Sequence, residues 1–286
     1  MSKKTKKQKV TEPEFYRSAT NIQTVNYNVY YMKKMEKLLT VAAAFVIGAA
    51  IGLLFYGGIG KDSYGEATTT TIVLDILIPC IVGAVAAKLF LPVRIASKKE
   101  KRLRDLNHQF RDMLDALTTS LSSGKNVVDS FSSVYEDLKI QYDEDAYIIK
   151  ELYVILDGVR NNVAIEELLE DFGKRSGLED IKSFANVFKI SYRKGGNIKD
   201  IIRNTHSIIS DKMEISEDIE TIVTSNKMEQ KIMIFMPIAL VAVIKFMSPE
   251  FAENFVTPSG IISTTISIAI FVIAYFIGRS VLNIKI

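Results

Sequence analysis

The feature that most constrains this 286-residue chain is an apolar stretch without any charged residue at positions 38–60. A helix needs roughly 20 apolar residues to cross the hydrocarbon core of a bilayer, so the stretch predicts a membrane span. Three further blocks have a similar length and composition, although the second contains Asp75 and Lys88 and the third contains Lys245. The sequence therefore predicts two hydrophobic hairpins, with spans at about 38–58 and 71–93 and at about 232–248 and 261–278.

A cleaved signal peptide is the alternative interpretation of the first stretch. However, 37 residues precede it and no small-residue cleavage pattern stands out, so we expect the stretch to stay in the mature chain. The single cysteine, Cys80, lies within the second predicted span. One cysteine excludes an intrachain disulfide and a thiolate metal cluster.

Basic residues concentrate beside the predicted spans. Residues 1–37 are rich in lysine, whereas the loops at 57–70 and 248–260 contain one basic residue and none. A second basic run directly follows the second span and consists of Lys98, Lys99, Lys101, Arg102 and Arg104. The positive-inside rule then predicts a multi-pass protein of the inner (cytoplasmic) membrane, with both termini and residues 94–231 in the cytoplasm.

The net charge of +3 does not indicate nucleic-acid binding, because the basic excess lies next to the membrane. We interpret the run from Lys98 to Arg104 as a contact with anionic lipid, since it follows a span and lacks interleaved aromatic residues. Residues 1–10 are predicted to be a mobile basic tail. Residues 28–37 are predicted to be an interfacial helix with Tyr30 and Tyr31 at headgroup depth.

The central block 94–231 has no proline, and its apolar residues recur at the three-and-four spacing of amphipathic helices. This pattern predicts an all-α bundle. The expected helices cover about 97–123, 127–138, 144–157, 164–175, 178–194 and 198–226, and the first and last continue into the flanking spans. Four domains follow: 1–37, the hairpin 38–93, the helical block 94–231 and the hairpin 232–286.

Within the block, residues 117–134 align without gaps with residues 188–205 in the pattern S-x-x-x-G-x-N-[VI]-x-D-x-[FI]. Glycine favours a helix end with positive φ, asparagine favours an N-cap, and aspartate favours the first turn of a helix. The pattern predicts two helix joints in two similar halves, formed by Gly124, Asn126 and Asp129 and by Gly195, Gly196, Asn197 and Asp200. Gly158 and Asn162 form a looser third instance.

These glycines do not fit a nucleotide-binding loop, because neither G-x-x-x-x-G-K-[ST] nor G-x-G-x-x-G is present. The two histidines, His108 and His206, are far apart and have no cysteine nearby, which is poor support for a zinc site. The acidic stretches 142–147 and 165–171 are interpreted as solvated helix residues, with docking to a basic partner as the alternative. We expect no catalytic, cofactor-binding or metal-binding residue.

Charged residues inside predicted spans call for a functional hypothesis. Lys88 lies close enough to the cytoplasmic end to extend its amine to the headgroups. Asp75 and Lys245 lie at matching depths near the outer ends of their spans. They are predicted to form an interhelical ion pair, with separate solvation at the outer interface as the alternative.

The arrangement of hairpins around a duplicated helical block resembles the type II secretion system F-domain family. The segments "FRDMLDALTTSLSSGKNVVDSF" (110–131) and "GKRSGLEDIKSFANVFKISYRKGGNIKDIIRNT" (173–205) carry the resemblance. The membrane layout is similar to the platform proteins of Tad-type pili. Asn162 stands where the family often has glycine, and Leu168 stands where it often has alanine. The matching residues are Leu114, Leu117, Gly124, Asp129, Leu168, Arg175, Gly177, Asp180, Phe184, Ala185, Gly195, Gly196 and Asn197.

The resemblance implies a non-enzymatic inner-membrane platform protein for pilus assembly or protein secretion. Such a protein binds a cytoplasmic hexameric ATPase and couples its motion to the extraction of pilin subunits, as an oligomer with itself or with a paralogous platform protein. The alternative is a transporter or channel subunit, in which Asp75, Lys88 and Lys245 line a polar path. The spans show no mutual similarity of the kind that many transporters have.

Overall fold

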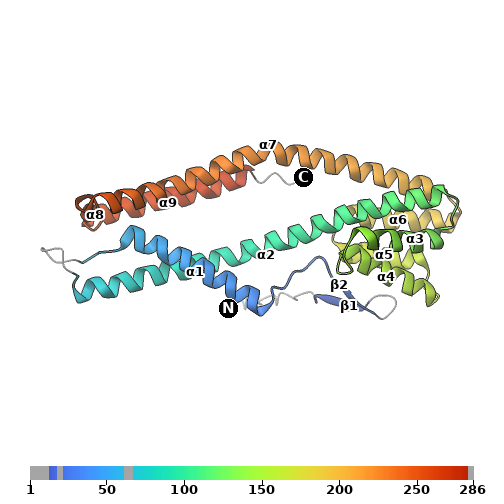
Figure 1. Ribbon diagram of the computed structural model, residues 1–286, viewed down its shortest axis with the longest axis horizontal. Coiled ribbons are helices and arrows are strands. Elements are labelled where there is room, and N and C mark those ends of the chain that lie inside the picture. The colour runs from blue at the N-terminus through green and yellow to red at the C-terminus, as the bar shows by residue number, and fades with distance from the viewer. Residues whose placement is uncertain (1–12, 18–21, 61–66, 283–286) are drawn as a thin grey trace, which may run out of the picture. The chain divides into compact units, whose positions relative to one another are not determined.

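The computed structural model describes residues 13–17, 22–60 and 67–282 and is almost entirely helical (Figure 1). The all-α prediction is therefore confirmed. The predicted basic tail and the loop residues 61–66 lie outside the described residues. The helices are α1 (Lys34–Tyr56), α2 (Thr69–Ser122), α3 (Val127–Gln141), α4 (Tyr147–Arg160), α5 (Ile165–Ser176), α6 (Glu179–Lys194), α7 (Ile198–Met247), α8 (Pro249–Asn254) and α9 (Pro258–Leu282).

The chain divides into two compact units. Unit 1 comprises Met1–Tyr31 and Ile95–Met213, and unit 2 comprises Met32–Arg94 and Glu214–Ile286. Helix α2 and helix α7 each contribute residues to both units without a break in the helix. The prediction that the first and last helices of the central block continue into the apolar stretches is thus confirmed.

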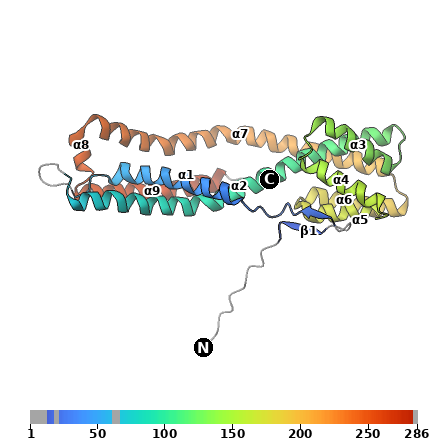
Figure 2. The same ribbon diagram turned by 60° about the horizontal axis from the view of Figure 1, so that its bottom comes forward.

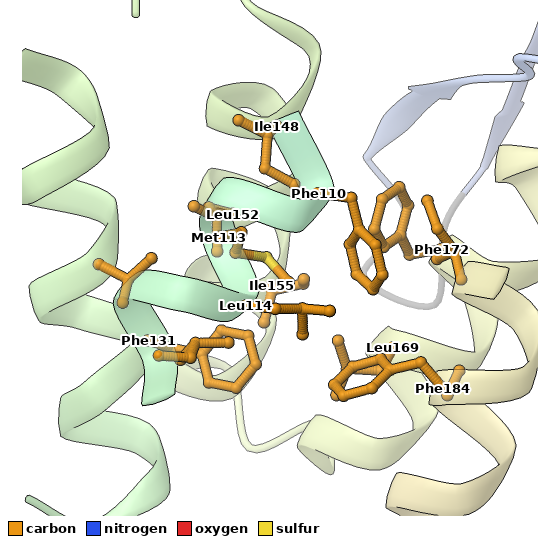
Figure 3. Packing of buried hydrophobic residues seen from close by; sticks show 14 of the residues in the cluster. Phe110, Met113, Leu114, Phe131, Ile148, Leu152, Ile155, Leu169, Phe172 and Phe184 are labelled. Carbon is orange, nitrogen blue, oxygen red and sulfur yellow. The ribbon is translucent and has the colours of Figure 1, made fainter. Parts of the chain in front are cut away.

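Unit 1 has a core to which every one of its helices contributes. Figure 3 shows Phe110 and Leu114 of α2 meeting Phe131 of α3, Leu152 of α4 and Phe172 of α5. The ring of Phe110 lies edge-on to Phe172 and to Phe184 of α6, with centroid separations of 6.2 and 5.5 Å. These contacts explain the predicted periodicity, because the residues at three-and-four spacing are those that the core buries.

The N-terminal residues of unit 1 differ from the prediction. Strands β1 (Phe15–Arg17) and β2 (Gln23–Val25) form an antiparallel hairpin, with Phe15 opposite Val25, beside the helices of unit 1 (Figure 2). Residues 28–33 are not helical, so the predicted interfacial helix at 28–37 is wrong except for the first turn of α1. Tyr27 is fully buried in the core of unit 1.

Unit 2 contains four helical stretches that are long and apolar enough to cross a membrane. They are α1, the apolar part of α2, Met228–Met247 of α7 and Pro258–Gly278 of α9. Helices α1 and α2 approach closely where glycines leave room: a Cβ on Gly48 would lie 2.6 Å from Ala86 Cβ, and one on Gly83 would lie 2.8 Å from the Phe45 carbonyl oxygen. The short helix α8 between α7 and α9 was not predicted.

Candidate functional site

The first helix joint has the predicted geometry. Gly124 has a φ of 89°, a left-handed conformation that glycine adopts without a steric penalty. Asn126 is the N-cap of α3, and its Oδ1 accepts a hydrogen bond of 2.9 Å from the Asp129 amide. The Asn126 amide nitrogen in turn donates to the Asp129 carboxylate. The carboxylate lies in the first turn of α3, where the helix dipole favours negative charge.

The second joint repeats this geometry. Gly195 ends α6 with a φ of 71°, and the Asn197 Oδ1 accepts from the Asp200 amide at 3.4 Å. Gly196 does not have a positive φ, and its amide donates to the Ser191 carbonyl at 2.8 Å. The two joints are alike residue by residue, while the duplication of whole halves stays a prediction.

The third instance is arranged differently from the prediction. Gly158 is buried inside α4, and Asn162 takes the left-handed position with a φ of 60°. Asparagine tolerates this conformation better than most residues. The N-cap of α5 is Ala164, which makes no side-chain capping bond. Asn162 therefore ends a helix as the glycines do elsewhere, instead of starting one.

A shallow hollow at the first joint is lined by residues 125–129, Leu121 and Tyr192, which lies three residues before Gly195. The end of α6 therefore lies beside the turn between α2 and α3. The glycine, asparagine and aspartate residues of both joints are exposed. Unit 1 thus presents two exposed turns of similar chemistry.

The predicted ion pair between Asp75 and Lys245 is not formed among the described residues. The Asp75 carboxylate instead accepts a hydrogen bond of 2.8 Å from the Gly58 amide, where the chain leaves α1. The Lys245 ammonium lies 5.1 Å from the centre of the Phe255 ring. Lys88 is exposed on α2. Asp75 and Lys245 therefore each have a partner near a helix end. Gly58 follows α1, and Phe255 follows α8.

The residues of the basic run after the second apolar stretch differ in their exposure and in their contacts. Lys101 and Arg104 are exposed, and Arg104 lies 3.9 Å from Glu100. Arg102 differs: its Nη1 donates to the Val29 carbonyl at 3.2 Å and its guanidinium lies 4.8 Å from the centre of the Tyr30 ring. Arg102 therefore binds the N-terminal segment of unit 1, while the contact of the basic run with lipid stays a prediction.

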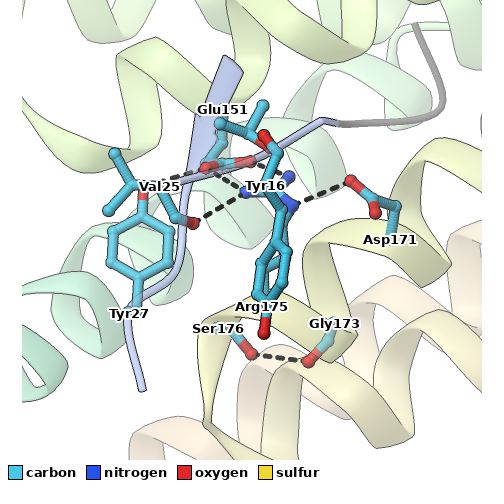
Figure 4. Close-up of polar contacts among 9 residues, drawn as sticks. Tyr16, Val25, Tyr27, Glu151, Asp171, Gly173, Arg175 and Ser176 are labelled. Carbon is cyan, nitrogen blue, oxygen red and sulfur yellow. Dashed lines mark hydrogen bonds and ion pairs between the residues drawn. The ribbon is translucent and has the colours of Figure 1, made fainter. Parts of the chain in front are cut away.

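A buried polar cluster in unit 1 was not predicted. Arg175 near the end of α5 and Glu151 in α4 form an ion pair of 2.7 Å, with side chains only 4% and 3% exposed. Asp171 accepts from the Arg175 Nε at 2.8 Å, and the Val25 carbonyl accepts from its Nη1 at 3.1 Å (Figure 4). Buried charges need paired and hydrogen-bonded surroundings, and this guanidinium has them on three sides.

Tyr27 completes the cluster. Its hydroxyl donates to Glu151 Oε1 at 2.9 Å, and its amide donates to the Arg175 carbonyl at 3.0 Å. Burial, followed by the charge of Glu151, raises the pKa of Tyr27 well above its ordinary value, so the hydroxyl remains a donor. Burial alone lowers the pKa of Arg175, but the hydrogen bond and charge of Glu151 and then Asp171 raise it.

One sequence signal could have identified this cluster. Glu151 follows Ile148 by three residues, and Arg175 follows Phe172 by three and Leu168 by seven. Each charged residue therefore falls on the apolar face of its own helix, where it must be buried. Two opposite charges on the apolar faces of neighbouring helices predict a buried pair. No comparable signal identifies Tyr27 as a member of the cluster.

The acidic stretch 165–171 is engaged in ion pairs with basic side chains of α5 and α6. The pairs include Glu166 with Arg193 at 3.1 Å and Glu170 with Lys174 at 2.7 Å. The stretch is therefore less negative towards a partner than its sequence indicates. His206 lies 3.9 Å from Asp115. Among the described residues, no group of three or more His, Cys, Asp or Glu side chains could hold a metal ion.

No protein-family model, curated protein or solved structure matches the chain.

Proposed function

We propose that this protein is an inner-membrane platform for pilus assembly or protein secretion, which couples a cytoplasmic hexameric ATPase to the extraction of pilin subunits. The observation that carries the proposal is that α2 and α7 each pass from unit 1 into an apolar stretch as one unbroken helix. The resemblance of residues 110–209 to the F-domain family gives the proposal its specific partners.

The apolar surface of unit 2 supports the membrane part of the proposal. In the four apolar stretches, at most 17% of the residues are buried against the protein. Exposure of a large apolar side chain to water costs about 1.5–3 kcal/mol, so a surface of this size needs a lipid environment. Helices are suited to that environment because their backbone polar groups are paired within the helix.

The distribution of charge supports the proposed orientation. The basic residues after the second stretch begin at Arg94, and the loop at 248–260 has none. The part of unit 1 that lies between the two pairs of apolar stretches, Ile95–Met213, is then cytoplasmic, together with both termini. A cytoplasmic unit 1 can bind an ATPase, and spans that join it can contact pilins within the membrane.

The unbroken helices support the mechanical part of the proposal. A helix transmits a displacement along its axis, and bending concentrates at special residues, here Pro79 and Pro92 of α2 and Pro237 of α7. A push by the ATPase on the exposed joints of unit 1 would therefore reach the membrane through α2 and α7. Domain motions of this rigid-body kind are common in switching proteins.

The transporter alternative has less support. A polar path through the spans would need Asp75, Lys88 and Lys245 to face a shared cavity. Asp75 is engaged by the Gly58 amide and Lys245 lies against Phe255. Both contacts are local to the helix ends. They give these charged residues partners without a polar path through the spans.

The decisive test compares two insertions of equal length after Ser97 in α2. A seven-residue helix-forming insert preserves the helix and changes its face by only about 20°, whereas a seven-residue Gly-Ser insert breaks it. With equal amounts of both variants in the membrane, we expect the helical insert to support pilus assembly and the Gly-Ser insert to abolish it. Normal assembly with the Gly-Ser insert would show that coupling does not pass through α2.

A second experiment tests the partner. The tagged full-length chain, extracted in detergent, should retain the hexameric ATPase, and a chain lacking residues 105–225 should not. Retention of the ATPase by the deleted chain would exclude unit 1 as its binding partner.

A further inference from the structure

We propose that the end of unit 1 formed by the two helix joints is the docking surface for an acidic segment of the hexameric ATPase. The joint surface is defined here by Lys125, Val127, Tyr192, Lys194, Lys199 and Arg203. The inference rests on the proposed function for the identity of the partner. It adds the surface of unit 1 that binds and the chemistry of the segment that is bound.

Both joints lie at the same end of unit 1. Tyr192, near the end of α6, lines the same hollow as Lys125 and Val127 of the first joint. His206 of α7 lies 3.9 Å from Asp115 of α2. This contact lies seven residues before the end of α2 and eight after the start of α7, so each joint is about 11–12 Å away along its helix.

Basic side chains beside the second joint have no acidic partner within the described part of the chain. Arg193 of α6 is paired with Glu166 at 3.1 Å. By contrast, no ion pair or hydrogen bond with another described residue engages the side chains of Lys194, Lys199 or Arg203. Lys194 and Arg203 are exposed, and Lys199 is half-buried. Their positive charge is therefore available to a binding partner.

The carboxylates of the two joints offset only part of this charge. Asp129 and Asp200 each accept a hydrogen bond from the asparagine three residues earlier, within their own turn. Together with Lys125, the joint surface has four basic side chains beside these two carboxylates. Nucleic acid or an anionic bilayer would place negative charge against Asp129 and Asp200 as well, whereas a protein segment can place its acids opposite the basic residues alone. The mixed charge therefore favours a protein partner.

Tyr192 adds an apolar contact next to the basic residues. Its side chain is 39% exposed, and its ring stacks on the buried Phe188 with centroids 5.4 Å apart and planes at 14°. Leu121 and Val127 line the same hollow. A tyrosine held in place by the core loses little conformational freedom on binding, and tyrosine and arginine are enriched among the residues that dominate interfaces. The bound segment should therefore carry an apolar side chain beside its acids.

The space above both turns is open. A Cβ built on Gly124 or on Gly195 would meet no atom within 4 Å. The backbone of each turn is therefore accessible to an approaching surface, along with the side chains that flank it.

The test measures how much hexameric ATPase the tagged full-length chain retains in detergent. The double variant Lys194→Glu/Arg203→Glu reverses two charges of the joint surface. The control Lys139→Glu/Lys182→Glu reverses two exposed charges of unit 1 outside this surface and changes the net charge equally. We expect the first variant to retain at least about tenfold less ATPase than the wild type, because like charges would then face each other. The control should retain the wild-type amount.

Salt separates an electrostatic role from a structural one. The screening length falls from about 10 Å at 0.1 M salt to about 3 Å at 1 M, so the difference between the wild type and Lys194→Glu/Arg203→Glu should narrow. A difference that does not depend on salt would overturn the proposal. Tyr192→Ala should lower ATPase retention at both salt concentrations, because an apolar contact is not screened.

The remaining outcomes distinguish this inference from the proposed function. Equal retention by the wild type and Lys194→Glu/Arg203→Glu, or equal losses in the two double variants, would overturn docking at the joints and leave the platform function standing. If the wild type retains no ATPase, the proposed partner is wrong and the inference fails with it.

A fluorescent DNA duplex and phosphatidylglycerol micelles serve as polyanion probes. If either binds the wild type but not Lys194→Glu/Arg203→Glu while ATPase retention is unchanged, the surface binds a polyanion and the proposal is overturned.

Discussion

The two units contain the same kinds of apolar residue and expose them very differently. In unit 1 Phe110, Phe172 and Phe184 are buried in one core, whereas in unit 2 Phe246 is 91% exposed and Phe235 and Phe276 are also exposed. Unit 1 has therefore satisfied its apolar side chains within the chain. The apolar side chains of unit 2 require surroundings that the chain itself does not supply.

This difference shows that apolar content alone does not identify a core. The apolar residues of unit 1 recur on one face of each helix, and those of unit 2 cover the helices on all sides. A helix that is apolar all round is either central in a large protein or in contact with lipid. Few residues of its four stretches are buried, so unit 2 is compatible with the second case, on which the proposed membrane location rests.

The largest expected effect compares the loss of a buried phenylalanine in unit 1 with the loss of an exposed one in unit 2. Phe110→Ala removes a ring that touches Phe172 and Phe184, and should lower the free energy of opening unit 1 by roughly 3–5 kcal/mol. Phe246→Ala, the matched change in unit 2, should lower it by less than about 0.5 kcal/mol. Hydrogen exchange of α4 amides in increasing urea measures both values. Equal losses would mean that the units are not energetically separate.

A somewhat smaller effect is expected within unit 1 for the buried ion pair. Arg175→Met leaves Glu151 buried without its guanidinium, and should destabilise α4 and α5 by about 3 kcal/mol, since the Tyr27 hydroxyl still donates to the carboxylate. Arg193→Met removes an ion pair with Glu166 from a side chain that is 54% exposed, and should cost no more than about 1 kcal/mol. Hydrogen exchange of α4 amides in increasing urea measures both losses of stability. Similar losses for Arg175→Met and Arg193→Met would show that burial does not determine how much an ion pair stabilises unit 1.

The two helix joints should differ by a smaller amount. Asn126→Ala should cost about 1 kcal/mol, the usual value of an N-cap, because its bond to the Asp129 amide is short at 2.9 Å. Asn197→Ala should cost roughly half as much, because the corresponding bond to Asp200 is 3.4 Å. Exchange of the first-turn amides of α3 and α7 measures each cap. A larger loss at Asn197 would reverse this order.

The smallest effect concerns pH. Hydrogen bonds from Lys174 and then from Lys189 lower the pKa of Glu170 to about 2 from its ordinary value of 4.5. A carboxyl with a lowered pKa in the folded state stabilises the protein above pH 4.5 and loses this contribution as the pH falls towards 2. The partly exposed pair is worth no more than about 1 kcal/mol. Glu170→Gln should be less stable than the wild type at pH 7, and the difference should shrink steadily as the pH falls from 4.5 towards 2.

The sequence predicted the helices of unit 1 because their signals are local. Periodicity places each helix, and Asn126 and Gly195 mark a start and an end within a few residues of where the structure has them. The same local logic misassigned Gly158, since Asn162 can take the left-handed position as well. Asn162 stands where the F-domain family that the chain resembles often has glycine. Asparagine also tolerates the left-handed backbone at this position.

The placement of residues 22–31 and the buried cluster around Arg175 could not be predicted in the same way. Their contacts join residues separated by 73, 124 and 150 positions, and residues 22–31 show no period that would reveal a buried face. Tyr30 and Tyr31 indicated an interfacial helix because they precede an apolar stretch. An interfacial helix and a segment bound to unit 1 would share this local pattern of aromatic and basic residues. Only the distant partners Arg102 and Arg175 distinguish the two structures.

The separation between Val25 and Arg175 has a consequence for biosynthesis. Arg175 is synthesised 150 residues after Val25, which takes about 8–30 s at ordinary translation rates. Helix α1 and the apolar start of α2 therefore leave the ribosome while the binding partners of Tyr27 do not yet exist. The first hydrophobic hairpin is therefore synthesised before residues 22–31 can bind Glu151 and Arg175, and this binding becomes a late step of maturation.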